Sequence, residues 1–286
     1  MVELFRTVED ARAFARRVRE QGKTLALVPT MGFLHEGHLS LMREGKSRAQ
    51  VCAATIFVNP TQFGPKEDLS RYPRDLEGDL RKCEQAGVDA VWAPEREQVY
   101  PHGYQTYVDV TDLSKGLCGE RRPGHFRGVA TVVTKLLALF RPDVALFGEK
   151  DFQQLRVIQR LNADLNLGVD VVGLPIVREP DGLAMSSRNG YLSAADRQRA
   201  LSLQRGLQAA QALCGRGTVN ARDLVGAVRA ELDAEEGVRT DYVELVDSET
   251  LAPIIRVADR PARLLVAAYL GTTRLIDNLE LREPSE

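Results

Sequence analysis

The run LALVPTMGFLHEGH, residues 25–38, sets the plan of the chain. Residues 25–28 are all apolar, which predicts a strand that is buried on both faces. A turn that contains glycine follows, and residues 39–49 have the pattern of a helix. Backbone N–H groups at a helix start favour an anion. Two of the four histidines of the chain, His35 and His38, stand in this turn, so the run predicts phosphate chemistry on a nucleotide.

Apolar strands and helical patterns alternate through the first two-thirds of the chain. The alternation predicts an α/β fold, in which helices cover both faces of a parallel sheet. We expect helices at 8–21, 38–49, 75–86, 129–140 and 152–165, and strands at 25–29, 51–59, 90–93, 144–147 and 169–174. Ligands bind outside the carboxyl ends of such strands. The segments that follow three strands, residues 31–38, 59–63 and 148–151, are therefore expected at one rim.

The last hundred residues have a different pattern. Ser193 and Asp196 form a capping signal for a helix that runs to Cys214, and Gly215 ends it. A second helix is expected at 221–234 and strands at 242–246, 264–270 and 274–276. Helices followed by strands predict a smaller C-terminal α+β domain. The expected division is a nucleotide-binding catalytic domain at 1–176 and the smaller domain at 177–286, which we expect to close over the nucleotide.

Composition restricts the class of partner. The 286 residues contain 38 Lys and Arg against 40 Asp and Glu, a net charge of 38 − 40 = −2, whereas nucleic-acid binders usually carry a basic excess. No apolar run approaches the ~18 residues that span a membrane. We therefore expect a cytoplasmic protein with small-molecule substrates, no nucleic-acid partner and no membrane association.

Two local motifs have alternative interpretations. A histidine pair could also comprise one capping residue and one zinc ligand or surface histidine, but a metalloprotease helix needs the longer His-Glu-x-x-His spacing. Gly45-Lys46-Ser47 resembles the end of a phosphate-binding Walker loop, yet Ser40 stands where the leading glycine belongs. We interpret this triplet as a solvated helix end.

Further polar groups are expected near the histidines. In Gly148-Glu149-Lys150-Asp151, the lysine could neutralise a polyphosphate and the aspartate could accept from ribose hydroxyls. Met185-Ser186-Ser187-Arg188 offers two hydroxyls and a guanidinium, a compact phosphate clamp. The neutral amides of Gln62 and Gln154 suit a hydroxylated substrate. Each motif alone also fits an ordinary solvated loop.

Together these segments resemble the pantoate–β-alanine ligase family over nearly the whole chain, in the family's order. The matching runs are VPTMG (28–32), HEGH (35–38), IFVNP (56–60), QF (62–63), RYPR (71–74), RPGHFRGV (122–129), FGEKDFQQL (147–155), SSRNGYL (186–192) and LIDN (275–278). The resemblance implies a Rossmann-like, doubly wound catalytic domain, a smaller carboxy-terminal domain and a homodimer. It also implies ATP with Mg²⁺ as co-substrate, the metal being carried mainly by the ATP phosphates, and pantoate and β-alanine as the other substrates.

The resemblance also implies roles for individual residues. The catalytic set is His38 as proton donor with His35, Lys150 and Arg188. The ATP-binding residues are Met31, Gly32, Phe33, Leu34, His35, Glu36, Gly37, His38, Gly148, Glu149, Lys150, Asp151, Val177, Met185, Ser186, Ser187 and Arg188. The substrate ligands are Gln62, Gln154 and Asn59. Some members have Leu-Glu-Gly where this chain has Leu117-Cys118-Gly119. Any contact that the glutamate makes in those members is therefore not expected of Cys118.

Three rival functions stay open at this point. Another His-x-Gly-His adenylyltransferase would retain an adenylyl product, a class I tRNA synthetase fragment would want a basic RNA-binding surface, and a nucleotide sensor would lack catalysis. Pantoate-dependent exchange between pyrophosphate and ATP separates all of these from the ligase.

Overall fold

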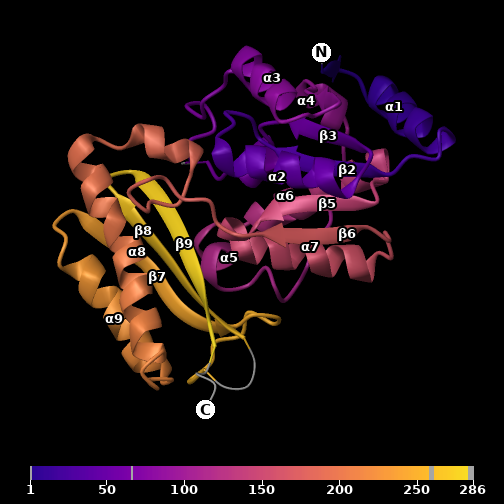
Figure 1. Cartoon of the computed structure of the whole chain (residues 1–286). Helices are drawn as coiled ribbons and strands as arrows, with labels where there is room; N and C mark the ends of the chain where they lie inside the picture. Colours follow the sequence, from indigo (N-terminus) through magenta and orange to yellow (C-terminus); the bar gives the residue numbers. More distant parts are fainter. Residues whose placement is uncertain (1, 66, 258–260, 283–286) are drawn as a thin grey trace. The chain divides into compact units, whose positions relative to one another are not determined.

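A computed structural model describes residues 2–65, 67–257 and 261–282 (Figure 1). The chain divides into two compact units. The first comprises Met1–Glu149 and Gln153–Pro175, and the second comprises Lys150–Phe152 and Ile176–Glu286. The division assigns three residues of the predicted nucleotide domain, 150–152, to the second unit.

The first unit is built on a parallel sheet. Within the described residues its strands lie in the order β1-β4-β3-β2-β5-β6, and every pairing is parallel. The strands are β1 (Glu3–Phe5), β2 (Leu25–Thr30), β3 (Val51–Ile56), β4 (Ala90–Trp92), β5 (Val144–Gly148) and β6 (Asp170–Leu174). Their carboxyl ends therefore share one edge. Sequence order reverses between β2 and β5, which is where ligands of doubly wound sheets bind.

Helices flank this sheet because β2 needs cover on both sides. Residues 25–28 alternate between the two faces, and all four are buried. Helix α2 packs on β2, β3 and β5, while α6 packs on α1 and β2. The helices of this part of the chain are α1 (Val8–Glu20), α2 (Glu36–Arg48), α3 (Leu76–Gln85), α4 (Arg96–Val99), α5 (Leu117–Arg121), α6 (His125–Phe140) and α7 (Phe152–Asp164), with short 3₁₀ turns η1 (Pro60–Gln62) and η2 (Glu149–Asp151). The predicted α/β class with a parallel sheet is confirmed.

Several predicted boundaries were wrong. Helix α2 begins at Glu36 and not at His38, which places the second histidine in its first turn. Helix α6 begins at His125 instead of Val129. Its N-cap is Gly124, so the helix includes residues 125–128, which precede the apolar stretch. The strand expected to reach Asn59 ends at Ile56. Gly45-Lys46-Ser47 lies in the last turns of α2, so the prediction of a helix end is confirmed, with Lys46 paired with Asp89 at 2.7 Å; Gly45 is buried, so the triplet is not solvated throughout.

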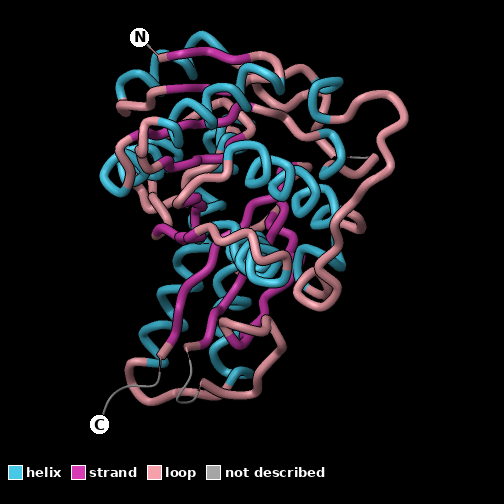
Figure 2. The backbone as a smooth tube through the Cα atoms, turned by 90° about the vertical axis from the view of Figure 1, so that its right-hand side faces the viewer, coloured by secondary structure: helices cyan, strands magenta, loops and turns pink. Residues whose placement is uncertain are grey.

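The second unit combines two helices with an antiparallel sheet of order β7-β8-β9 in the described residues. Its elements are η3 (Ser187–Tyr191), α8 (Ala194–Cys214), α9 (Ala221–Asp233), β7 (Val238–Asp247), β8 (Ala262–Leu270) and β9 (Thr273–Leu281). Ser193 accepts from the Asp196 N–H at the start of α8, as the capping signal predicted. Helices α8 and α9 pack on each other and on strands of this sheet (Figures 1 and 2). The unit therefore has its own apolar core, and the α+β prediction is confirmed.

Among the described residues no helix combines the length and the apolar character needed to cross a bilayer.

Candidate active site

The turn between β2 and α2, residues 31–38, is called the nucleotide turn below. Thr30 fixes its start: the hydroxyl donates to the Thr55 carbonyl at 2.6 Å and accepts from the Gly32 N–H at 3.2 Å. Gly32 has φ +85°, and an added Cβ would lie 2.9 Å from Ile56 Cγ2. Both the backbone angle and the packing therefore require glycine here.

A buried carboxylate from α3 holds the middle of the nucleotide turn. Asp79 is 1% exposed, and its two oxygens accept from the backbone N–H groups of Phe33 and Leu34, both at 2.7 Å. Lys82, one turn later, donates to the Leu34 carbonyl at 2.7 Å. Burial raises the pKa of Asp79, although the two backbone bonds and Lys82 act to lower it. Asp79 was not predicted from the sequence, although the signal was visible: a carboxylate stands four residues before the apolar Cys83, on the same helix face.

The histidines end the nucleotide turn. His35 precedes α2 in extended conformation, and its N–H donates to Nδ1 of His38 at 3.3 Å. A neutral imidazole that accepts at Nδ1 carries its proton on Nε2. The two rings lie 4.1 Å apart between centroids, and both are half-buried. The hydrogen of neutral His38 therefore lies on Nε2, in the first turn of a helix whose start favours an anionic group.

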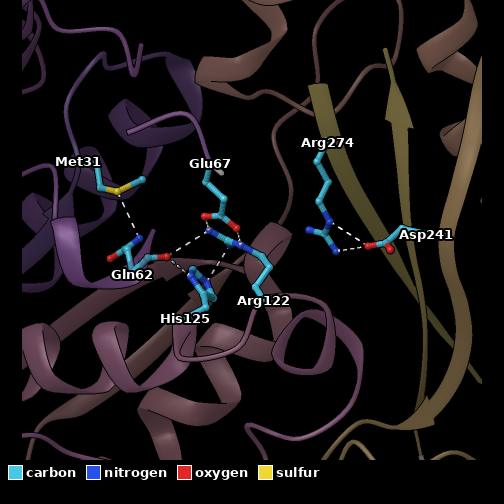
Figure 3. A network of polar contacts seen from close by, with 7 residues as sticks. All are labelled: Met31, Gln62, Glu67, Arg122, His125, Asp241 and Arg274. Carbon is cyan, nitrogen blue, oxygen red and sulfur yellow. Dashed lines mark hydrogen bonds and ion pairs between the residues drawn. The ribbon is translucent and has the colours of Figure 1, made fainter. Parts of the chain in front are cut away.

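Asn59 and Gln62 follow β3, as the N-cap and the last residue of η1, and Gln62 contacts the nucleotide turn. The Gln62 amide nitrogen donates to Met31 Sδ at 3.3 Å (Figure 3). Its oxygen accepts from Asn59 Nδ2 at 2.9 Å. Asn59 is 1% exposed, and its oxygen accepts from the Thr61 hydroxyl and the Tyr100 hydroxyl, each at 2.9 Å. Asn59 thus holds the turn η1 and orients Gln62, while a direct contact of Asn59 with substrate stays a prediction.

Neighbouring glutamines at the start of α7 have different surroundings. Gln153 is 3% exposed; its oxygen accepts from the Cys118 N–H, and its nitrogen donates to the Leu113 carbonyl, both at 3.0 Å. Gln154 is only half-buried. The structure therefore places Gln153 in the support of the loop before α5 and leaves Gln154 as the substrate candidate.

Lys150, Asp151 and the predicted residues between 177 and 188 belong to the second unit. Residues 177–188 are called the clamp segment below. Met185 donates its N–H to the Val177 carbonyl at 3.0 Å, and the Ser186 hydroxyl accepts from the Arg188 N–H at 3.2 Å. Asn189 and Arg197 both donate to Glu179 at 2.6 Å. These bonds join the two ends of the clamp segment and tie it to α8.

Two residues of the LIDN run support this group. Asp277 is 3% exposed and receives two bonds from Arg178, at 2.7 and 3.0 Å. Asn278 is 2% exposed and donates to the Lys150 carbonyl at 3.0 Å. The sequence indicated no role for this run, which in the structure holds the backbone of Lys150 and the start of the clamp segment.

The predicted residues thus form two groups. The first unit holds the nucleotide turn, Asn59, Gln62, Gly148, Glu149 and Gln154; the second holds Lys150, Asp151 and the clamp segment. Their convergence on one nucleotide stays a prediction. Within the described part of the chain no group of three or more His, Cys, Asp or Glu side chains is placed to hold a metal ion.

Comparison with known proteins decides the family. The family model described as pantoate-beta-alanine ligase matches residues 3–280. The chain belongs to this family. It is 68% identical over 280 residues to a pantothenate synthetase of Myxococcus xanthus, covering 97% of this chain and 96% of that protein.

Solved structures of the family share the fold. The crystal structure of pantothenate synthetase from Thermus thermophilus matches with a TM-score of 0.93 at 45% identity, covering 98% of this chain and all of that one. A pantoate-beta-alanine ligase from Francisella tularensis, complexed with beta-gamma ATP and beta-alanine, matches with a TM-score of 0.81 at 30% identity, covering 98% and 97%. The chain is therefore a ligase of pantothenate biosynthesis with the family's two-part fold.

Proposed function

We propose that the chain joins (R)-pantoate to β-alanine through an adenylate, with the nucleotide turn and the clamp segment on one ATP. A pantoate carboxylate oxygen attacks the α-phosphorus, the bond to the bridging oxygen of the β-phosphate breaks, and pyrophosphate leaves. The β-alanine amine then attacks the acyl carbon, the C–N bond forms with loss of a proton, and AMP leaves. The observation that carries this proposal is the bond from the His35 N–H to His38 Nδ1, which directs the proton of the second imidazole away from the backbone.

The proposed roles follow the charge of the side chains: donor and cationic residues act on the phosphates, and neutral amides act on pantoate. A carboxylate that approaches a polyphosphate is repelled, and preorganised positive groups reduce this repulsion most effectively in the transition state. We assign His38 as the hydrogen-bond donor to the phosphates, with His35, Lys150 and Arg188 sharing the charge. Gln62 and Gln154 are proposed to orient pantoate, and the neutral donor and acceptor of the Gln62 amide suit its hydroxyl groups.

Magnesium is proposed to arrive on the ATP phosphates, where it would neutralise part of their charge. No protein ligand is assigned to it, since the described carboxylates and histidines form no cluster suited to a cation. We also propose that residues 177–286 close over the nucleotide and exclude water from the reactive acyl phosphate. The protein is proposed to be cytoplasmic and to form a homodimer. Light scattering measures the oligomeric state.

Exchange of labelled pyrophosphate into ATP tests the chemistry. We expect exchange that requires pantoate and does not require β-alanine, followed by AMP release when β-alanine is added. Exchange without pantoate would reject the substrate, whereas a retained adenylyl product would favour another adenylyltransferase. A chain that binds ATP without any exchange would be a nucleotide sensor.

A further inference from the structure

Three side chains of the first unit gather behind the backbone of Gln62. Arg122 donates to both oxygens of Glu67 at 2.7 Å, and its third nitrogen lies 3.0 Å from Nε2 of His125 (Figure 3). The other ring nitrogen, Nδ1, lies 2.8 Å from the Gln62 carbonyl oxygen. We call Glu67, Arg122 and His125 the Gln62 support. Arg122 and His125 come from the run RPGHFRGV, and Glu67 comes from the loop after η1. The proposed mechanism gives none of these three residues a role.

The two contacts of the His125 ring determine which of its nitrogens carries the hydrogen. A carbonyl only accepts, so His125 Nδ1 carries the hydrogen and Nε2 accepts from Arg122. Arg122 also donates to the same Gln62 carbonyl at 3.3 Å. One carbonyl thus receives two donors, one of them charged, and charge-assisted hydrogen bonds are the stronger kind. His125 is buried, as are two polar neighbours, Asn59 and Gln62 itself.

Helix α6 packs directly against the backbone of Gln62. Gly128, in the first turn of α6, leaves no room for a side chain: an added Cβ would lie 2.4 Å from the Thr61 carbonyl oxygen and 2.7 Å from the Gln62 nitrogen. The Gly128 carbonyl accepts from Asn59 at 3.1 Å. Helix α6 therefore holds η1 from behind, and Asn59 holds the Gln62 amide from the side.

We propose that the Gln62 support is a set of positioning residues for pantoate recognition, acting through the Gln62 backbone. The inference rests on the proposed role of Gln62 as a pantoate ligand. The turn η1 has only three residues and few internal hydrogen bonds. If the Gln62 carbonyl loses the hydrogen bonds from His125 and Arg122, the turn can shift. A displacement of about 1 Å at a positioning group can cost up to about 10²-fold in rate. The effect should fall on pantoate and leave ATP binding almost unchanged.

A double-mutant cycle tests the proposal. We expect His125→Ala to raise the KM for pantoate about tenfold, the effect of one lost hydrogen bond, while the KM for ATP stays within about twofold. In the Gln62→Ala background the same substitution should raise the pantoate KM by less than about twofold, because residues that act through one group are not additive. Equal fold-changes in the two backgrounds would overturn the proposal.

His125→Asn is the rescue variant. The asparagine amide places an N–H near the position of Nδ1, so it can still donate to the Gln62 carbonyl. We expect its pantoate KM to lie within about threefold of the original chain, well below that of the alanine variant. If His125→Ala does not fold, Glu67→Gln takes its place in the cycle. An asparagine variant as impaired in pantoate KM as the alanine variant would count against a role of the donated bond.

The second unit offers a matched control. Arg274 and Asp241 form a similarly buried ion pair, with contacts of 2.9 and 3.0 Å, and lie outside every predicted site (Figure 3). Asp241→Asn should lower the melting temperature without raising the pantoate KM. If His125→Ala behaves in the same way, the Gln62 support is merely structural and the inference fails. If the unsubstituted chain shows no pantoate-dependent exchange, the proposed function itself fails, a result that the cycle cannot mimic.

Discussion

The nucleotide turn and the clamp segment are held by contacts of opposite kinds. The turn depends on Asp79, a carboxylate that is 1% exposed and bonded to two backbone N–H groups. The clamp segment depends chiefly on ion pairs that water can reach, such as Glu179 with Arg197, whose side chains are 24% and 30% exposed. Buried polar groups are costly to unpair, whereas exposed pairs are screened and worth little. The comparison indicates a fixed turn and a clamp that can be adjusted at low cost.

His38→Ala should give the largest effect, because it removes the donor that the turn presents. We expect adenylate formation to fall roughly 10²–10⁴-fold, the range for a positioned proton donor. Pre-steady-state formation of the adenylate measures it. His102→Ala, at an exposed histidine outside the site, is the control and should retain full activity. An unaltered turnover number in His38→Ala would refute the assignment.

Asp79→Asn tests whether the turn depends on buried acceptors. The amide keeps one oxygen but presents an NH₂ group to the other backbone N–H. We expect the free energy of unfolding to fall by about 2–4 kcal/mol and the affinity for ATP to fall at least about tenfold. Urea titration and ATP binding measure the two. Asp75→Asn alters only the cap of the same helix, and equal ATP affinities in the two variants would contradict the special role of Asp79.

Arg178→Gln tests the most buried contact of the clamp segment. It leaves the Asp277 carboxylate, which is 3% exposed, without its bidentate partner. Removing one partner of a buried pair costs about 3–5 kcal/mol, and the partial exposure of Arg178 reduces our expectation to about 2–3 kcal/mol. Thermal unfolding of the variant measures it. A loss no greater than that of an exposed pair such as Arg160 with Asp164 would contradict the expected cost of unpairing Asp277 and would extend the low-cost adjustment to the whole clamp segment.

Glu179→Gln should have the smallest effect, and one that depends on pH. The Arg197 hydrogen bond lowers the pKa of Glu179, burial opposes it, and the Asn189 bond lowers it further, with a net lowering. A carboxylate with a lowered pKa in the folded chain stabilises it above the unfolded value of about 4.3, and this contribution disappears as the pH falls through the folded value. We expect a difference of about 0.2–1 kcal/mol at pH 7 that shrinks in 1 M salt and below about pH 4.

That prediction is checked by urea unfolding of both chains between pH 3 and pH 7. A difference that grows on acidification would have the wrong sign for a lowered pKa and would contradict the assigned ion pair.

The sequence predicted the elements whose signal is local. Strand β2 and helix α8 were found because an apolar run and a serine cap are visible within a few residues. Strand β1 was missed, since three residues carry no periodicity and its parallel pairing with β4 joins positions almost ninety residues apart. The start of α6 was misplaced because its first turn, residues 125–128, holds a single apolar side chain, Phe126, and so shows no helical periodicity of its own.

The candidate site divides in the same way. The histidine pair and Gln62 were predicted as site residues from chain-adjacent motifs, and the order of the motifs indicated the family, which the comparisons confirm. Asp79 and Asn278 were missed as supports, because each bonds a backbone group that is remote in the sequence. Supports of this type follow from tertiary packing, which a single sequence does not display.

The close approach at Gly128 has a practical consequence for protein engineering. Replacing helix-interior glycines by alanine is a common route to thermostability, with a gain of about 0.5–1 kcal/mol at an exposed site. Gly226, exposed in α9 with nothing within 4 Å of an added Cβ, suits that strategy. At Gly128 the same methyl group would strike the backbone of η1, so an alanine that stabilises α9 would displace the turn that carries Gln62 when placed in α6.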